Sequence, residues 1–136
     1  MLISVSPEKI APSQDFLKEN TVRFIFGCLR TGNLEELPPT PLVRKDPQGN
    51  LVAIDGHNLI AVRAFRDDEE MEVIVAESAT DGLPPTSEAN RTRNEELAAK
   101  FDTVLAEREK VAAEGIETFA QLIAKYKPLF DELSAA

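Results

Sequence analysis

The sequence has very few of the residues that build metal centres and disulfide frameworks. It contains one cysteine, Cys28, and one histidine, His57, in 136 residues. One cysteine cannot form a disulfide within the chain, and a zinc site would have to rely mainly on carboxylates, which is uncommon. The sequence therefore predicts neither a disulfide scaffold nor a metal site, and Cys28 is expected to be a core residue.

Basic residues are also scarce relative to acidic ones. The chain has 15 Lys and Arg against 24 Asp and Glu, which gives a formal net charge of -9. Non-specific affinity for nucleic acid comes mostly from phosphate neutralisation by Lys and Arg. Direct DNA binding is therefore not expected.

Long apolar runs are missing as well. The first ten residues, MLISVSPEKI, do not resemble a signal peptide, and no run approaches the roughly 20 apolar residues of a membrane span. At 43% hydrophobic residues the chain can still bury an ordinary core. We expect a soluble, cytoplasmic protein with no membrane partner.

The first half of the chain alternates between strand and helix patterns. In the helix predicted at 18–30, the apolar residues Val22, Ile25, Phe26 and Leu29 follow the spacing i, i+3, i+4, i+7. A strand at 22–26 is the alternative, but the helical period holds for longer. The other predicted elements are strands at 2–5, 42–45, 51–54 and 71–76, a hairpin turn at 46–50 and a helix at 57–66.

The second half has a different composition. A linker with Gly and two prolines, 78–87, precedes two helices predicted at about 88–113 and 116–133. Ser87 is the expected N-cap of the first, Gly115 marks the break, and Pro128 predicts a kink. We expect a first domain at 1–78, and helices at 79–136 that pack on it or form the interface of a homodimer.

The most informative stretch is Asn50–Val62, NLVAIDGHNLIAV. A buried strand stops at Asp55-Gly56, and a helix follows. This geometry leaves backbone N–H groups unpaired at the start of the helix, where they can bind an anion. His57 is the candidate catalytic base and Asp55 its orienting partner. The alternatives are that His57 braces the turn through Asp55 or a backbone group, and that Asp55 is an Asx-turn residue.

The segment LPPTPLVRKDPQGNLVAIDGHNLIAV resembles the core of the ParB-like nuclease-type domain, which has the ParB/sulfiredoxin fold. Upstream, Ala11-Pro12-Ser13-Gln14 resembles the PSQ segment that precedes the first helix of bacterial ParB-like proteins. The resemblance covers about residues 2–77. It implies an α+β fold, a small mixed sheet with helices, followed here by a C-terminal helical hairpin.

The resemblance also implies a nucleotide- or phosphate-binding pocket at the turn, with Mg²⁺ as companion of a nucleotide. The expected ligand-binding residues are Gly56, Asn58, Ser13, Gln14 and Arg44. Ser13 and Gln14 could instead cap the first helix. Leu59 and Ile60 stand where the family usually has an Arg that binds the phosphate. The nearby cations that could take over this contact are Arg44, Lys45 and Arg63.

Three functions follow as hypotheses. The first is a nucleotide- or phosphate-binding regulatory or interaction module. The second is an enzyme, a nuclease or phosphotransferase that uses His57 as base. The third is a non-catalytic interaction protein that dimerises through its C-terminal helices.

Overall fold

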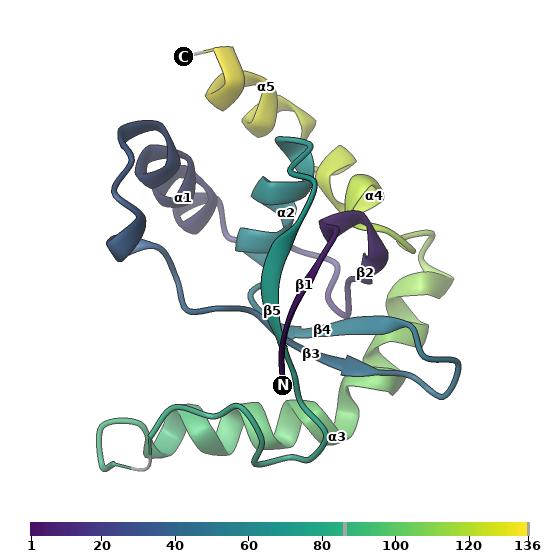
Figure 1. Cartoon of the computed structure of the whole chain (residues 1–136). Coiled ribbons are helices and arrows are strands. Elements are labelled where there is room, and N and C mark those ends of the chain that lie inside the picture. The colour runs from purple at the N-terminus through teal and green to yellow at the C-terminus, as the bar shows by residue number, and fades with distance from the viewer. Residues whose placement is uncertain (86, 136) are drawn as a thin grey trace.

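The computed structural model describes residues 1–85 and 87–135 and confirms an α+β fold (Figure 1). Its five-stranded mixed sheet has the order β1-β5-β3-β4-β2. The strands are β1 (Leu2–Val5), β2 (Ile10–Ala11), β3 (Leu42–Lys45), β4 (Leu51–Asp55) and β5 (Met71–Val75). The helices are α1 (Glu19–Thr31), α2 (His57–Phe65), α3 (Arg91–Ala113), α4 (Phe119–Ala124) and α5 (Lys127–Ala135), with 3-10 turns η1 (Pro7–Lys9) and η2 (Leu34–Glu36).

The predicted hairpin forms the centre of the sheet. Strands β3 and β4 are antiparallel, and the Asp46 carboxylate closes their turn by accepting the N–H groups of Gln48 at 2.9 Å and Asn50 at 2.8 Å. Strand β5 adds to β3 in parallel, which requires the crossover through α2. Strand β1 then pairs antiparallel with β5 and forms one edge of the sheet.

Helices cover both faces of the sheet, which explains the continuous apolar run in β4. Leu51 and Ala53 belong to a core shared with α1, α2, α4 and α5. Val52 and Ile54 point to the opposite face, where they pack with Val104 of α3. Because side chains alternate along a strand, a strand covered on both faces needs apolar residues at every position.

The single helix predicted at 116–133 is wrong, because the structure contains two short helices there. Helix α4 begins after Thr118, whose side chain accepts the Gln121 N–H while the Gln121 side chain accepts the Thr118 N–H, a capping box. The chain then leaves α4 at Lys125, and α5 begins at Lys127. Pro128 lies in the first turn of α5, where its missing N–H costs little, so it starts a helix and does not kink one.

Two other boundaries differ from the prediction. Helix α3 begins at Arg91, and Ser87 accepts the Asn90 N–H at 3.2 Å in the turn before it. Ser87 therefore closes that turn and does not cap the helix. No strand is predicted from the sequence where the two-residue strand β2 forms, because its strand character comes from parallel pairing with the distant β4.

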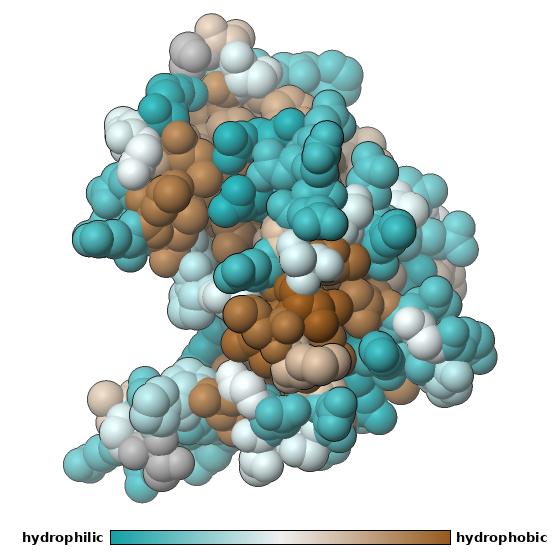
Figure 2. Space-filling view, in the orientation of Figure 1, coloured by the Kyte–Doolittle hydropathy of each residue, from teal (hydrophilic) through white to brown (hydrophobic). Residues whose placement is uncertain are grey.

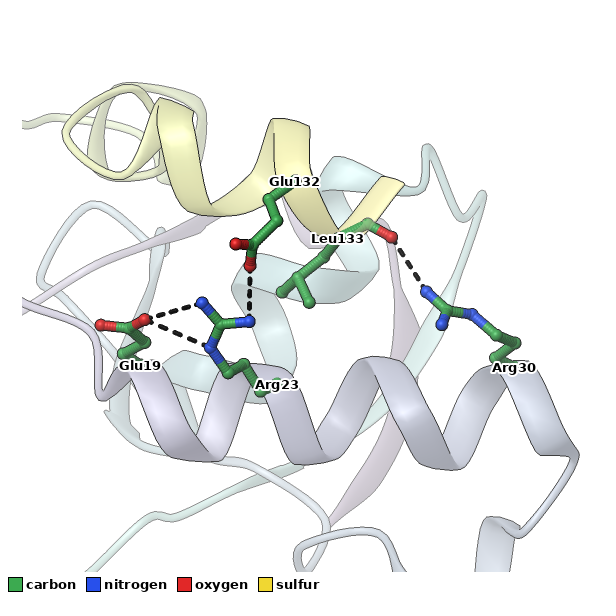
Figure 3. A network of polar contacts seen from close by, with 5 residues as sticks. All are labelled: Glu19, Arg23, Arg30, Glu132 and Leu133. Carbon is green, nitrogen blue, oxygen red and sulfur yellow. Dashed lines mark hydrogen bonds and ion pairs between the residues drawn. The ribbon is translucent and has the colours of Figure 1, made fainter. Parts of the chain in front are cut away.

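The C-terminal helices pack on the first half of the chain (Figure 3). Arg23 of α1 forms an ion pair with Glu132 of α5 at 2.5 Å, and Arg30 donates to the Leu133 carbonyl at 2.9 Å. The apolar residues Phe119 and Phe130 are fully buried in the main core. No helix in the described part of the chain is both long and apolar enough to span a membrane.

Candidate functional site

His57 ties the N-terminal loop to the turn between β4 and α2. The imidazole is only 3% exposed, and its Nε2 accepts the Ser13 backbone N–H at 3.0 Å. Ser13 Oγ lies 3.3 Å from the same nitrogen and donates to the Ala53 carbonyl at 2.6 Å. The Phe119 ring covers the imidazole at 5.7 Å between centroids. His57 is thus bonded to a backbone group, which is one of the two arrangements expected for a bracing residue.

The environment of His57 keeps it neutral. Burial, and secondarily the positive charge of Lys100, lower the pKa of His57 to about 3. Since Nε2 accepts a hydrogen bond, the ring proton belongs on Nδ1. The lone pair that a general base would use is therefore occupied by the Ser13 N–H, and base catalysis by Nε2 would require that bond to break.

Asp55 and Asn58 also have partners in the structure. The Asp55 carboxylate forms an ion pair with Arg93 of α3. Asn58 Oδ1 accepts the backbone N–H of Lys18 at 2.8 Å. Lys18 is the N-cap residue of α1 and its own side chain makes no capping bond, so Asn58 supplies a missing acceptor at that helix start. Both side chains thus hold neighbouring elements against the turn.

Gly56 is required by its backbone conformation and by close packing. Its φ of 90° lies in the left-handed region, and a Cβ atom there would be 2.7 Å from Pro41 Cβ and 2.9 Å from Pro41 Cα. Pro41 ends the proline-rich approach to β3, so the stiff segment places a ring directly against the turn. The side of Gly56 that a Cβ atom would occupy is therefore filled by Pro41.

Arg44 contacts α3 and not the turn. Its Nη1 donates to the Phe101 carbonyl at 2.6 Å, and its guanidinium stands 4.2 Å from the centroid of the Phe101 ring. A hydrogen bond and a cation–π contact from one side chain fix α3 to the sheet. Arg44 thus has a structural partner in place of the predicted ligand.

A cavity of about 300 Å³ adjoins the turn and opens between the N-terminal loop and α3. It contains two of the predicted ligand-binding residues, Ser13 and Gln14, whereas Gly56, Asn58 and Arg44 are not among its lining residues. The lining consists of Ser13, Gln14, Phe16, Ile54, Lys100, Thr103, Val104 and Glu107. A wider hollow of about 910 Å³ between the linker and the start of α3 holds none of the predicted site residues.

Sequence reasoning missed the residues that α3 contributes to this site. Lys100 and Arg93 fall on the apolar stripe of α3, since Leu97 lies three residues before Lys100 and four after Arg93, and Val104 lies four after Lys100. A cation at such a position lies beside the surface on which the helix packs, although Lys100 is exposed and the Arg93 side chain is 42% exposed. That spacing is the signal that could have identified Lys100 and Arg93.

No family model and no curated protein matches this chain. The resemblance to ParB-like domains therefore stays a prediction that rests on the motif residues and the order of elements.

The cavity offers groups suited to a small anion with an aromatic part. Lys100 supplies a positive charge, Ser13 and Thr103 supply hydroxyl groups, and the Phe16 ring is 47% exposed near the opening. Glu107 brings one negative charge to the same wall. Among residues 1–85 and 87–135, no group of three His, Cys, Asp or Glu side chains is placed to hold a metal ion.

Proposed function

We propose that the chain is a ParB-like regulatory or interaction module that binds a nucleotide or another small phosphorylated compound. The observation that carries the proposal is one cavity that joins Ser13 and Gln14 of the N-terminal loop with Lys100 of α3. The cavity lies beside the Asp55-Gly56-His57-Asn58 turn, because Ser13, which lines the cavity, donates its backbone N–H to His57.

A nucleotide suits the chemistry of this cavity in size and in polarity. Small-ligand pockets are typically about 300–1,000 Å³, mostly apolar, with a few polar groups that fix orientation. Lys100 would face the phosphate as a point charge. The exposed Phe16 ring would stack on the base, which is a contact worth about 1–3 kcal/mol per base.

The position of the cavity suggests how binding would be communicated. One wall is the loop from Pro12 to Lys18, which His57 and Asn58 hold through two backbone bonds. The other wall is α3. A ligand that bridges both walls would stabilise the closed arrangement of loop and helix by mass action. Such a module would act in the cytoplasm, where nucleotides are abundant and a lone Cys28 stays reduced.

Thermal unfolding with and without nucleotides tests the proposal. Wild type, Lys100→Gln and the control Lys127→Gln, which removes the same charge from the exposed face of α5, would be heated with nucleoside mono-, di- and triphosphates and with inorganic phosphate, each with and without Mg²⁺. A ligand at about 100 times its Kd stabilises by about 2.7 kcal/mol, or roughly 5–10 °C in Tm for a chain of this size.

We expect that increase in wild type and in Lys127→Gln, and its loss in Lys100→Gln. The proposal fails if none of these compounds raises the Tm of wild type. It also fails if Lys100→Gln keeps the full increase, because the ligand would then bind elsewhere.

A further inference from the structure

A second concave site, unrelated to the proposed ligand cavity, lies where α2 and β5 meet the segment after α1. Its volume is about 400 Å³. The apolar lining residues are Leu34, Leu37, Pro38, Pro41, Leu59 and Met71. The polar ones are Ser4, Thr40, Arg63, Glu70 and Glu72. We refer to these eleven residues as the acidic groove. It shares no residue with the cavity at Ser13.

Leu34 gives the groove an exposed apolar edge. It is 59% exposed although it lies in the short 3-10 turn η2, beside Leu37, which is half-buried. In Figure 2, hydrophobic surface over α1 and the segment after it lies beside hydrophilic surface over the turn between α2 and β5. An apolar area bordered by charged residues is typical of a surface that contacts another molecule.

The charges around the groove are mainly negative. Five of the six residues 67–72 are acidic, and Glu35 and Glu36 follow Leu34 directly. The two nearby cations, Arg63 and Arg66, both point at Asp68, at 3.0 Å and 3.9 Å. Glu70 accepts the Ser4 hydroxyl at 3.1 Å. In the described ranges 1–85 and 87–135, neither Glu70 nor Glu72 forms an ion pair, so both keep a negative charge that a cationic partner could neutralise.

We infer that the acidic groove docks a short basic amphipathic segment of a partner protein. Leucine-like side chains of that segment enter between Leu34 and Leu59, and its Lys or Arg side chains face Glu70 and Glu72. Charge complementarity selects this occupant, because carboxylates at the rim repel phosphate groups and acidic peptides. The buried apolar contact supplies affinity, and the rim charges supply specificity.

Titration of the ¹⁵N-labelled full chain with two synthetic peptides tests this inference. One is a helix-forming amphipathic peptide of Leu and Lys, and the other has Glu at every Lys position. We expect the Lys peptide to shift the amide signals of Leu34, Leu37, Leu59 and Glu72, and the Glu peptide to shift none. Absence of binding by the Lys peptide, or equal binding of both peptides, would overturn the inference.

Variants separate docking in the groove from attraction by the net charge. Glu72→Lys reverses a charge at the groove, and Glu109→Lys makes the same change on an exposed position of α3. Leu34→Ser removes the apolar edge at an exposed site. We expect Glu72→Lys and Leu34→Ser each to weaken binding of the Lys peptide about tenfold. We expect Glu109→Lys to change the affinity by less than about twofold. Equal weakening by Glu72→Lys and Glu109→Lys would show that the peptide responds only to the net charge.

Discussion

Lowering the pH from about 7 to about 5 should destabilise the folded chain by about 2 kcal/mol through His57 alone. In the unfolded chain the imidazole has its ordinary pKa of 6.5, whereas burial lowers the pKa to about 3 in the folded chain. Between these values the unfolded state binds a proton that the folded state excludes. The contribution of His57 to the free energy of unfolding is therefore fully present above pH 6.5 and is lost progressively as the pH falls toward 3.

Urea unfolding at the two pH values measures this effect. Carboxylates also titrate in this range, so the useful quantity is the difference between wild type and His57→Gln. Glutamine keeps a neutral acceptor for the Ser13 N–H but cannot be protonated. We expect the free energy of unfolding to fall by about 2 kcal/mol more in wild type than in the variant.

The chain has one histidine, so its proton NMR signal gives a second readout without assignment problems. We expect that signal to keep the chemical shift of neutral imidazole down to about pH 4. The idea that His57 is a buried, neutral residue that braces the turn would be refuted by two results together. These are an NMR titration midpoint near pH 6.5 and an equal pH dependence of the free energy of unfolding in wild type and His57→Gln. The same two results would also restore His57 as a candidate base.

Three further predictions concern the turn and its cover. Gly56→Ala should cost about 3 kcal/mol or more in urea unfolding, because it combines a left-handed backbone with a steric clash. The control Gly49→Ala, with a φ of 85° and no atom within 4 Å of the added Cβ, should cost about 1 kcal/mol. Asp55→Asn and Arg93→Gln should each cost less than about 1 kcal/mol, since both side chains are partly exposed, and a double-mutant cycle should give a coupling of about 0.5 kcal/mol. Phe119→Ala should cost about 3–5 kcal/mol and raise the pKa of His57, measured by its NMR titration, because it opens the imidazole to water.

Most of the first half of the fold could be predicted from local patterns. The hairpin follows from turn residues that act within five positions, as Asp46 does for Gln48 and Asn50. The end of α1 follows from Gly32, which takes a φ of 74°. Such signals are contained in a short window and need no knowledge of distant contacts.

The failures have long-range or competing causes. Strand β2 exists because two residues pair with a strand forty positions away. The break between α4 and α5 was overlooked because apolar periodicity continues through it. The capping box at Thr118 and the position of Pro128 mark two helix starts within that single apolar pattern.

The motif predicts a turn followed by a helix start at 55–58, and the structure has both there. The contact of Ser13 with His57 joins residues 44 positions apart and has no local signal in the sequence. The cations that complete the arrangement, Arg93 and Lys100, come from α3, which sequence reasoning treated as core or interface alone. The sequence shows that Arg93 and Lys100 share a helix face with Leu97 and Val104. It does not show which surface they face, because that depends on how α3 packs across the sheet.

The most direct test of the proposed function is titration of the ¹⁵N-labelled full chain with nucleotides and inorganic phosphate. Binding in the cavity predicts signal changes concentrated at Ser13 to Phe16 and at Lys100 to Val104, and their loss in Lys100→Gln. Absence of changes at millimolar ligand, or changes confined to residues outside the cavity, would contradict the proposed function.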